Sequence, residues 1–494
     1  MSAARRGTDR DTERADVVVV GARCAGSAAS IALAKAGRRV VALDRAVFPS
    51  DTLSTHVIFP SGVAQLARLG ALERVLVTGV PRCPRIMLSA EGVTVVERYR
   101  ALEGIDYSMC MPRTELDLAL VETARGYGAD VREHSAVTGL LWEGDRVAGV
   151  RYRAEDGTTR EIRAPLVIGA DGRKSTVASL VGVEEPYRGS KNGRGLAFWY
   201  MDDPKVGTPW RDVLVQWRVG QVFGMCFPCP HDRMLVLFMG PAEDIPRFQR
   251  DAKGMWEQML RQHRRLADRV EGATNATKLR ATGDTSAYFR ASSGAGWALV
   301  GDAGHFKDPV IAQGIGDALL YGRLLGECAA ATLDDPRALD RALRDWEAKR
   351  DRECLPAYHW ANNETRTEPV SRLTVEALRS FAAAPEQRNV CDMFSRVRKP
   401  EKVISYPRMV VWLTRALMRP GAPRRSLVRE GMRETRIHFD IVYEGWRREF
   451  RSRRVAASDH PGWKHAPTAP AARPTPAPVA AAPAPSETLA EALA

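Results

Sequence analysis

The chain has 494 residues, of which 45% are hydrophobic and 27% charged, as expected for a globular protein with two or three structural units. Eight cysteines do not make a disulfide framework in a chain of this length, and no uncharged apolar run reaches the roughly 18 residues that a transmembrane helix needs. Residues 1–14 are polar and lack the apolar core of a secretory signal, so we expect a flexible leader on a cytoplasmic protein.

A β-α-β unit is predicted directly after the leader. Asp16–Val20 has the composition of a buried parallel strand, Ser27–Lys35 that of a closely packed helix, and Arg39–Leu43 that of a second strand. Gly21 permits the tight turn after the first strand, and Gly26 lets the helix pack close to the sheet. Because the helix N-terminus presents free N–H groups to a pyrophosphate, the unit predicts dinucleotide binding.

Two side chains beside this turn bear on the ligand. Asp44, which ends the second strand 23 residues after Gly21, is placed to accept hydrogen bonds from a ribose hydroxyl. Arg23 stands where a G-x-G-x-x-G sequence has its middle glycine. The Arg23 side chain either adds a cation near the phosphates or points to solvent. The alternative to dinucleotide binding is an ordinary β-α-β unit with a glycine turn.

The rest of the α/β pattern is interrupted by a strand-rich segment. We predict an α/β fold in which residues 15–185 and 295–335 form one Rossmann-like domain. Residues 186–294, with part of 80–110, form an inserted antiparallel sheet that binds substrate. Aromatic residues of the insertion form the roof of a substrate cavity or belong to its core: Phe198, Trp199, Tyr200, Trp217, Phe223 and Phe227.

The C-terminal third carries most of the excess charge. The net charge is +13, and residues 396–454 alone hold 17 Lys and Arg against 6 Asp and Glu. We predict a basic helical region over residues 336–455, followed by a disordered Pro- and Ala-rich tail over 456–494. Residues 407–454 form a solvated surface or make a peripheral membrane contact, and we expect no nucleic acid partner because no such motif is present.

Three further motifs, together with the N-terminal turn, carry a family resemblance. Met111-Pro112-Arg113 precedes a helix, Asp171-Gly172 follows a strand, and Gly301-Asp302 leads into Gln313–Ala318. In this order the four motifs resemble the class A flavoprotein monooxygenases and their relatives, the geranylgeranyl reductases and flavin-dependent halogenases, over roughly residues 15–335. The resemblance implies a glutathione-reductase-type domain that binds FAD.

The resemblance also assigns roles to residues. It implies that Arg113 contacts the FAD phosphates or ribose, that Asp302 hydrogen-bonds the ribityl chain, and that the helix starting near Gly314 faces the flavin pyrimidine. A helix N-terminus there stabilises negative charge on the reduced ring. The complete set of predicted cofactor-binding residues is Gly21, Arg23, Ala25, Gly26, Asp44, Arg45, Arg113, Val137, Asp171, Gly172, Asp302, Pro309, Gly314, Ile315 and Gly316.

One histidine is a candidate for catalysis. His56 ends the segment Asp51–His56, in the loop that passes beside the isoalloxazine in the resembling proteins. It is the polar residue that we expect nearest to the reacting atoms, although a lone histidine is more often structural. No histidine spacing suggests a metal site, and we interpret Cys226 and Cys229 as buried free thiols.

The resemblance favours an NAD(P)H-dependent monooxygenase that hydroxylates or epoxidises a sizeable apolar or aromatic metabolite through a flavin hydroperoxide, by analogy in secondary metabolism. The absence of a second G-x-G-x-x-G unit fits, because class A enzymes lack a separate nicotinamide domain. A prenyl double-bond reductase stays open, since Ala312 and Gly316 replace a glycine and an asparagine of the monooxygenase pattern. Two weaker alternatives are a halogenase, which resembles this chain around Asp308-Pro309 but has a WxWxIP signature that is missing here, and a non-catalytic flavin protein at a membrane surface. The sequence does not choose between NADH and NADPH or give an oligomeric state.

Overall fold

The computed structural model describes residues 13–191, 193–450 and 463–465, so most of the expected leader and tail lies outside the described residues. Two short strands differ from those expectations. Glu13–Arg14, placed in the leader by the sequence, forms β1 and pairs in parallel with β11 (Thr159–Arg163). Trp463–His465, placed in the disordered tail, forms β23 and pairs with β13 (Arg188–Ser190).

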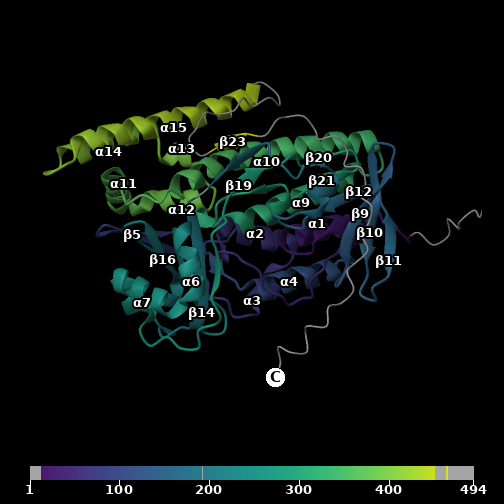
Figure 1. The fold of residues 1–494 in the computed structure, drawn as a ribbon, viewed down its shortest axis with the longest axis horizontal. Coiled ribbons are helices and arrows are strands. Elements are labelled where there is room, and N and C mark those ends of the chain that lie inside the picture. Colours follow the sequence, from purple (N-terminus) through teal and green to yellow (C-terminus); the bar gives the residue numbers. More distant parts are fainter. Residues whose placement is uncertain (1–12, 192, 451–462, 466–494) are drawn as a thin grey trace, which may run out of the picture.

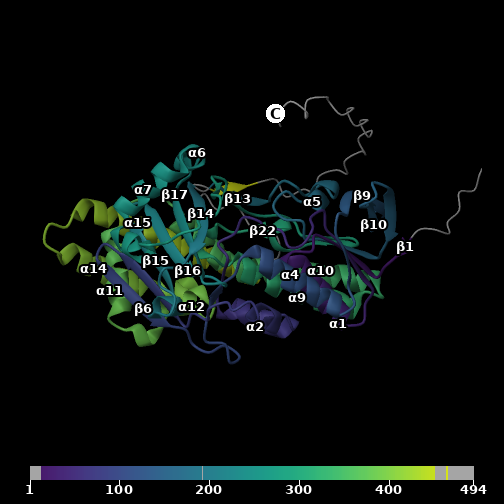
Figure 2. The ribbon, with the colours of Figure 1, turned by 90° about the horizontal axis from the view of Figure 1, so that it is seen from below.

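A six-stranded sheet forms the core of the first lobe, at the right of Figures 1 and 2. Its spatial order is β20-β21-β12-β2-β3-β8, all parallel except β20: β2 (Val17–Val20), β3 (Val40–Leu43), β8 (Asp130–Arg132), β12 (Leu166–Gly169), β20 (Ser293–Gly294) and β21 (Trp297–Leu299). Both faces are covered, which explains why Val17–Val20 is apolar throughout. Val17 and Val19 face the helices, whereas Val18 and Val20 face an antiparallel meander.

The covering elements come from distant parts of the sequence. The helices on one face are α1 (Cys24–Lys35), α4 (Arg113–Gly126) and α9 (Gly314–Thr332). The meander on the other face consists of β9 (Ala136–Glu143), β10 (Arg146–Arg153) and β11. Helices α1 and α9 pack with backbone nearly in contact, because a Cβ added at Gly322 would lie 2.5 Å from the Ala25 carbonyl oxygen.

A seven-stranded sheet forms the second lobe, with spatial order β18-β14-β17-β16-β15-β5-β6. Its strands are β5 (Arg85–Ala90), β6 (Val93–Arg98), β14 (Arg194–Asp202), β15 (Val213–Val219), β16 (Val222–Pro228), β17 (Arg233–Pro241) and β18 (Arg280–Thr282). All neighbours pair antiparallel except β5 with β15. Helices α6 (Ile245–Arg250), α7 (Ala252–Gln262) and α8 (Arg264–Val270) cover its outer face.

Strand alternation divides the aromatic residues of this sheet between two cores. Phe198 faces inward, whereas Trp199 and Trp217 lie in the outer core under α6–α8. Trp199 contacts the rings of Phe238 and Trp256 at centroid distances of 6.2 and 5.3 Å. The two tryptophans are therefore core residues and do not form the cavity roof that the sequence offered as one interpretation.

C-terminal helices close the molecule on one side. They are α10 (Pro336–Glu364), α11 (Arg372–Ala382), α12 (Asn389–Phe394), α13 (Pro400–Val403), α14 (Tyr406–Met418) and α15 (Arg424–Phe450). Helix α10 runs from the first lobe to the second, and α15 forms the upper edge in Figure 1. Helix α14 packs against α11 and α15. No helix in the described part of the chain combines the length and apolarity of a membrane span.

Short elements complete the described fold: β4 (Val57–Ile58), α2 (Pro60–Leu69), α3 (Leu72–Leu76), β7 (Met109–Cys110), α5 (Thr176–Leu180), β19 (Ala287–Phe289), β22 (His305–Phe306), and 3₁₀ turns at Pro209–Asp212, Ala242–Asp244, Gly301–Ala303, Pro309–Ile311 and Pro385–Gln387. The thiols of Cys226 and Cys229 are free and buried, as predicted. Cys229 lies nearest Cys110, with 3.5 Å between their sulfur atoms.

Candidate active site

Two glycines at the turn between β2 and α1 lie where an added side chain would have no room. Gly21 adopts φ +96°, and an added Cβ would lie 2.6 Å from the Ala170 carbonyl oxygen. A Cβ on Gly26 would lie 1.8 Å from the Gly21 carbonyl oxygen. Ala25, the neighbouring predicted residue, faces Gly301 of the loop before α9. The turn thus brings the N-terminus of α1, with its free N–H groups, to the carboxyl edge of the sheet.

Asp44 fixes the other side of this turn. Its carboxylate accepts hydrogen bonds from the backbone N–H of Ala22 at 2.7 Å and of Ala46 at 2.8 Å. Each carboxylate oxygen has a further lone pair, so these bonds leave acceptor capacity for a ribose hydroxyl. Arg45, also predicted to bind the cofactor, is exposed next to it.

Arg23 and Arg113 converge on a carboxylate to which the sequence analysis gave no role. Arg23 Nη1 lies 2.5 Å from Asp117 Oδ2, and Arg113 Nη2 lies 2.8 Å from Asp117 Oδ1. Arg23 also donates to the Ser50 carbonyl oxygen at 3.1 Å, so its side chain is held beside α4 and does not point to solvent. The signal was present in the sequence, because Asp117 follows Arg113 by four residues and so shares its helix face.

Two predicted residues after β12 have a clear structural role. Asp171 accepts hydrogen bonds from Ser175 Oγ at 2.5 Å and from the Thr176 N–H at 2.7 Å, and so holds the start of α5. Gly172 adopts φ +82° with open space at its Cβ position. Val137 lies on β9, opposite Tyr152, and packs half-buried against the core between meander and sheet.

The surroundings of the Asp302 carboxylate suit a polar ligand. It lies half-buried on the turn Gly301–Ala303, near Arg113 and Arg173. Burial raises its pKa, although both guanidinium groups lower it. Within the described chain no hydrogen bond from another residue to its carboxylate is found. A hydroxyl-rich chain such as ribityl would supply the missing donors.

The N-terminus of α9 is exposed on the same side. Asp308 holds the preceding turn, because it accepts from the Val310 N–H at 2.8 Å and from Thr365 Oγ1 at 2.6 Å. Ala312 adopts a left-handed φ of +49°, a conformation that glycine reaches without cost. No atom lies within 4 Å of a Cβ added at Gly314, whereas at Gly316 the added Cβ meets Gly62 of α2. Ile315 is buried, and Pro309 opens the 3₁₀ turn.

These features fit FAD. Two helix N-termini, at α1 and α9, provide free N–H groups, and Gly314 leaves open space where backbone would approach a ligand. Arg113 and Asp302 supply a cation and an acceptor between them. The chain therefore has donors for a pyrophosphate and acceptors for sugar hydroxyls along one edge of the sheet.

His56 lies beside this edge in an apolar environment. It is fully buried and adopts φ +63°, and neither ring nitrogen has a hydrogen-bond partner in the described chain. Its ring centroid lies 4.9 Å from that of Phe198 and 5.4 Å from that of Tyr200. Burial, followed by the charge of Arg113, lowers the pKa of His56 to about 3. The imidazole is consequently neutral at pH 7.

Two adjoining cavities lie between the lobes and the C-terminal helices. The inner cavity, of about 20 Å³, is lined by Thr55 and Pro309, which flank the predicted flavin loops. The outer cavity has a volume of about 220 Å³. They share four lining residues: Leu88, Gln216, Val310 and Phe394. The two cavities therefore adjoin across these four side chains, and the inner one lies beside the predicted flavin loops.

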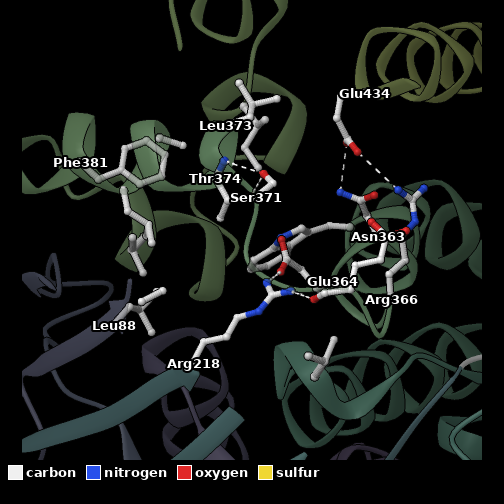
Figure 3. A pocket seen from close by; sticks show the side chains of 18 of the residues that line it. Leu88, Arg218, Asn363, Glu364, Arg366, Ser371, Leu373, Thr374, Phe381 and Glu434 are labelled. Carbon is white, nitrogen blue, oxygen red and sulfur yellow. Dashed lines mark hydrogen bonds and ion pairs between the residues drawn. The ribbon is translucent and has the colours of Figure 1, made fainter. Parts of the chain in front are cut away.

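The outer cavity has an apolar interior and a charged mouth (Figure 3). Leu88 and Arg218 rise from the sheet, while Leu373 and Phe381 face them from α11. Trp360, Trp412 and Met409 extend the apolar wall. Charged pairs line the mouth: Arg218–Glu364 at 3.7 Å, Arg366–Glu434 at 3.4 Å and Arg433–Glu368 at 3.1 Å. Sequence reasoning missed the contribution of the C-terminal helices because contacts between distant segments leave no local pattern.

A buried charged cluster surrounds Asp317 of α9. Ligand-type atoms of His305, Asp317 and Cys354 lie within 4.8 Å of one another. The Asp317 carboxylate, however, forms ion pairs with both Lys307 and Arg396. Two cations therefore already compensate its charge, and the cluster ties α9 to the segment after α12 rather than opening to the cavity.

Comparison with known proteins decides the family. The family model described as "FAD binding domain" matches residues 14–351, about two thirds of the chain. This protein belongs to that FAD-binding family. It is an FAD-dependent oxidoreductase with the Rossmann-like fold that the sequence predicted.

Individual relatives of this FAD-dependent oxidoreductase have different activities. A menaquinone reductase of Mycolicibacterium smegmatis is 29% identical over 64% of this chain and 76% of its own length. A 6-methylpretetramide 4-monooxygenase of Streptomyces rimosus is 32% identical over 36% of this chain and 42% of its own. A crystal structure of a flavoprotein/dehydrogenase from Cytophaga hutchinsonii has the same fold, with a TM-score of 0.68 and 19% identity over 78% of this chain and 93% of that one.

Proposed function

We propose that this protein is an NAD(P)H-dependent monooxygenase for a sizeable apolar or aromatic metabolite. When bound, FAD would accept electrons from NAD(P)H and use them to activate molecular oxygen. The observation that carries the proposal is the apolar inner cavity between the His56 loop and the turn before α9. Its polar side chains are Thr55 and Gln216, and no carboxylate lines it in the described chain.

The cavities divide substrate binding between two places. The outer cavity holds the body of the substrate between the sheet and α11, with any polar group at the charged mouth. In this proposal the reacting end of the substrate lies at the four residues that line both cavities. Asp308 fixes the turn that carries Pro309 and Val310, so the wall of the inner cavity is rigid. Apolar walls exclude bulk water from the reacting groups, which suppresses side reactions with water.

The neutral state of His56 favours oxygen transfer over double-bond reduction. Reduction of a carbon–carbon double bond requires a proton to reach carbon, which demands an effective acid. His56 has a pKa of about 3, so it carries no proton to donate as imidazolium at pH 7. Burial raises the pKa of Tyr200, its neighbour, which makes that hydroxyl a weaker acid. Neither group is therefore an effective acid for such a reduction at pH 7.

A reductase of an isoprenoid-type substrate is the second candidate. It is favoured by the menaquinone reductase relative, which aligns over 76% of its own length, whereas the monooxygenase relative aligns over 42%. The long apolar cavity would also accept an isoprenoid chain. In this case the missing proton would come from a substrate group or a bound water.

Flavin reduction and product mass separate the candidates. The FAD-loaded protein is mixed anaerobically with NADPH or NADH, and the visible flavin band is followed before and after oxygen is admitted. Polycyclic phenols and isoprenoid quinones are then supplied under labelled oxygen gas. Incorporation of one labelled oxygen atom supports the monooxygenase. A gain of two hydrogen atoms without oxygen refutes it and supports the reductase, and failure of both nicotinamides to bleach the band contradicts the NAD(P)H assignment.

A further inference from the structure

Helices α14 and α15 expose apolar side chains on the face that points away from the protein. On α14 these are Tyr406, Val410, Val411 and Met418, and on α15 they are Val428, Met432, Phe439, Val442 and Tyr443. Met418 is 79% exposed, Met432 60%, Tyr443 57% and Phe439 53%. Single exposed apolar residues are common, but nine on two adjoining helices form an extended apolar surface. We call these nine residues the outer patch.

The outer patch is held as one rigid unit. The Tyr406 and Phe439 rings contact each other across the two helices, with centroids 5.3 Å apart. The helices also cross closely, because a Cβ added at Gly431 would lie 2.5 Å from a Leu413 methyl group. The opposite side of α14, at Met409 and Trp412, is buried and lines the outer cavity. The pair of helices is therefore a wall with the cavity on one side and the outer patch on the other.

The charge around the outer patch is predominantly positive. Residues 396–450 contain 14 Lys and Arg and 6 Asp and Glu. Three of the six acids are turned inward: Glu430 and Glu434 line the cavity, and Glu444 is buried against Arg188 and His359. Exposed arginines, in contrast, are numerous on and beside the two helices: Arg415, Arg419, Arg424, Arg425, Arg429 and Arg436. Arg419 pairs with Glu376 of α11 and Arg436 with Asp440, and the other four form no ion pair within the described chain. The face presented to a partner is consequently both apolar and cationic.

We propose that the outer patch docks the protein peripherally on an anionic lipid surface. An amphipathic helix with large apolar residues flanked by arginine binds such a surface by inserting the apolar groups among the acyl chains, while the guanidinium groups meet anionic headgroups. A second copy of this chain would bring two cationic faces together, and like charges oppose that contact. The docked wall would also place the outer cavity close to the lipid, on the inner side of α14 and α15.

Vesicle binding by the full-length, FAD-loaded protein tests this proposal without any turnover. Sedimentation is measured with sucrose-loaded vesicles of phosphatidylcholine alone and with 30% phosphatidylglycerol, at low and high salt. The expected result is binding to the anionic vesicles that is about tenfold or more stronger than to neutral ones and that weakens at high salt.

Matched variants locate the contact. Met432→Glu/Phe439→Glu replaces two exposed residues that do not line the cavity, and we expect at least about tenfold weaker vesicle binding. Val77→Glu/Val206→Glu changes two valines outside α14 and α15 that are 86% and 46% exposed, adds the same charge, and leaves binding unchanged. Unaltered thermal unfolding of both variants shows that they are folded. The proposal is overturned if the wild type ignores anionic vesicles, if both variants bind like the wild type, or if the patch variant instead converts a dimer to a monomer in light scattering.

Discussion

Gly314 and Gly26 lie in the first turns of the two helices that point at the predicted cofactor. A methyl group added at these two positions would meet opposite surroundings. At Gly26 it would lie 1.8 Å from backbone, whereas at Gly314 no atom lies within 4 Å. Gly26 is thus required by the protein itself. The open space at Gly314 has no such structural reason, and a bound cofactor would explain it.

Gly314→Ala should separate folding from cofactor binding. Because alanine favours helix over glycine by up to about 1 kcal/mol, the apoprotein should be as stable as the wild type or slightly more stable. The methyl group should still weaken FAD binding by about tenfold or more, measured by quenching of flavin fluorescence. Gly139→Ala, whose Cβ would meet ordinary contacts at 3.8 Å, serves as the control with unchanged affinity. Wild-type affinity of Gly314→Ala would show that FAD does not approach α9 there.

His56 makes a second residue-scale prediction, for the pH dependence of stability. Its folded pKa of about 3 lies below its ordinary value of 6.5, so the unfolded chain binds the proton first as the pH falls. The free energy of unfolding should therefore fall between pH 6.5 and pH 3, with this residue contributing about 2 kcal/mol of the loss at pH 5. His56→Asn removes the titration and tolerates the left-handed φ of +63°. Urea unfolding at pH 7 and pH 5 should show the smaller loss in the variant; equal losses would contradict the buried, neutral assignment.

At the scale of elements, the contact between α1 and α9 sets where both helix N-termini point. A Cβ on Gly322 would lie 2.5 Å from the Ala25 carbonyl oxygen, and one on Gly326 would lie 2.6 Å from that of Ala29. Since backbone atoms cannot move aside as a side chain can, any larger residue forces the helices apart.

Gly322→Ala should consequently lower the free energy of unfolding by about 1–3 kcal/mol, as overpacking of a close contact does. It should also weaken FAD binding, because both N-termini shift. This double effect distinguishes it from Gly314→Ala on the same helix. Urea unfolding followed by circular dichroism checks the stability, and a midpoint equal to that of Gly139→Ala would mean that the close packing is relieved without cost.

The strand elements show where sequence patterns were sufficient. Asp16–Val20 was predicted as a buried parallel strand, and Val17–Val20 forms one, with its side chains buried on both faces of the six-stranded sheet. In the second sheet the aromatic content alone did not tell Phe198 from Trp199, because both are large and apolar. Their separation into two cores depends on which face of the sheet meets which helices.

At the scale of the whole molecule, the outer cavity exists only where both lobes and the C-terminal helices meet. Ala377 and Leu378 of α11 face Leu88 and Phe223 of the sheet across this space. The cavity volume of about 220 Å³ should therefore respond to substitutions on α11 that leave the FAD-binding lobe untouched.

Ala377→Trp should fill much of this cavity. We expect turnover of large substrates to fall by about tenfold or more through a raised KM, because their uniform binding is lost, while FAD affinity stays unchanged. Ser380→Trp, on the same helix at a position that does not line the cavity, is the control. Steady-state kinetics with the substrate found in the product screen check this prediction. An unchanged KM would place the substrate outside the outer cavity.

The sequence by itself determined the dinucleotide turn, the family and the alternation of α/β and strand-rich segments. These follow from contacts between near neighbours: glycine conformations at Gly21 and Gly26, strand periodicity and short motifs such as Gly301-Asp302. Tertiary structure alone decided that Arg23 and Arg113 meet at Asp117, that α14 forms a cavity wall, and that nine apolar residues remain outside. The physical reason is that burial and ion pairing between distant segments depend on how whole elements pack, and residues hundreds of positions apart leave no periodic trace of their contact in the chain.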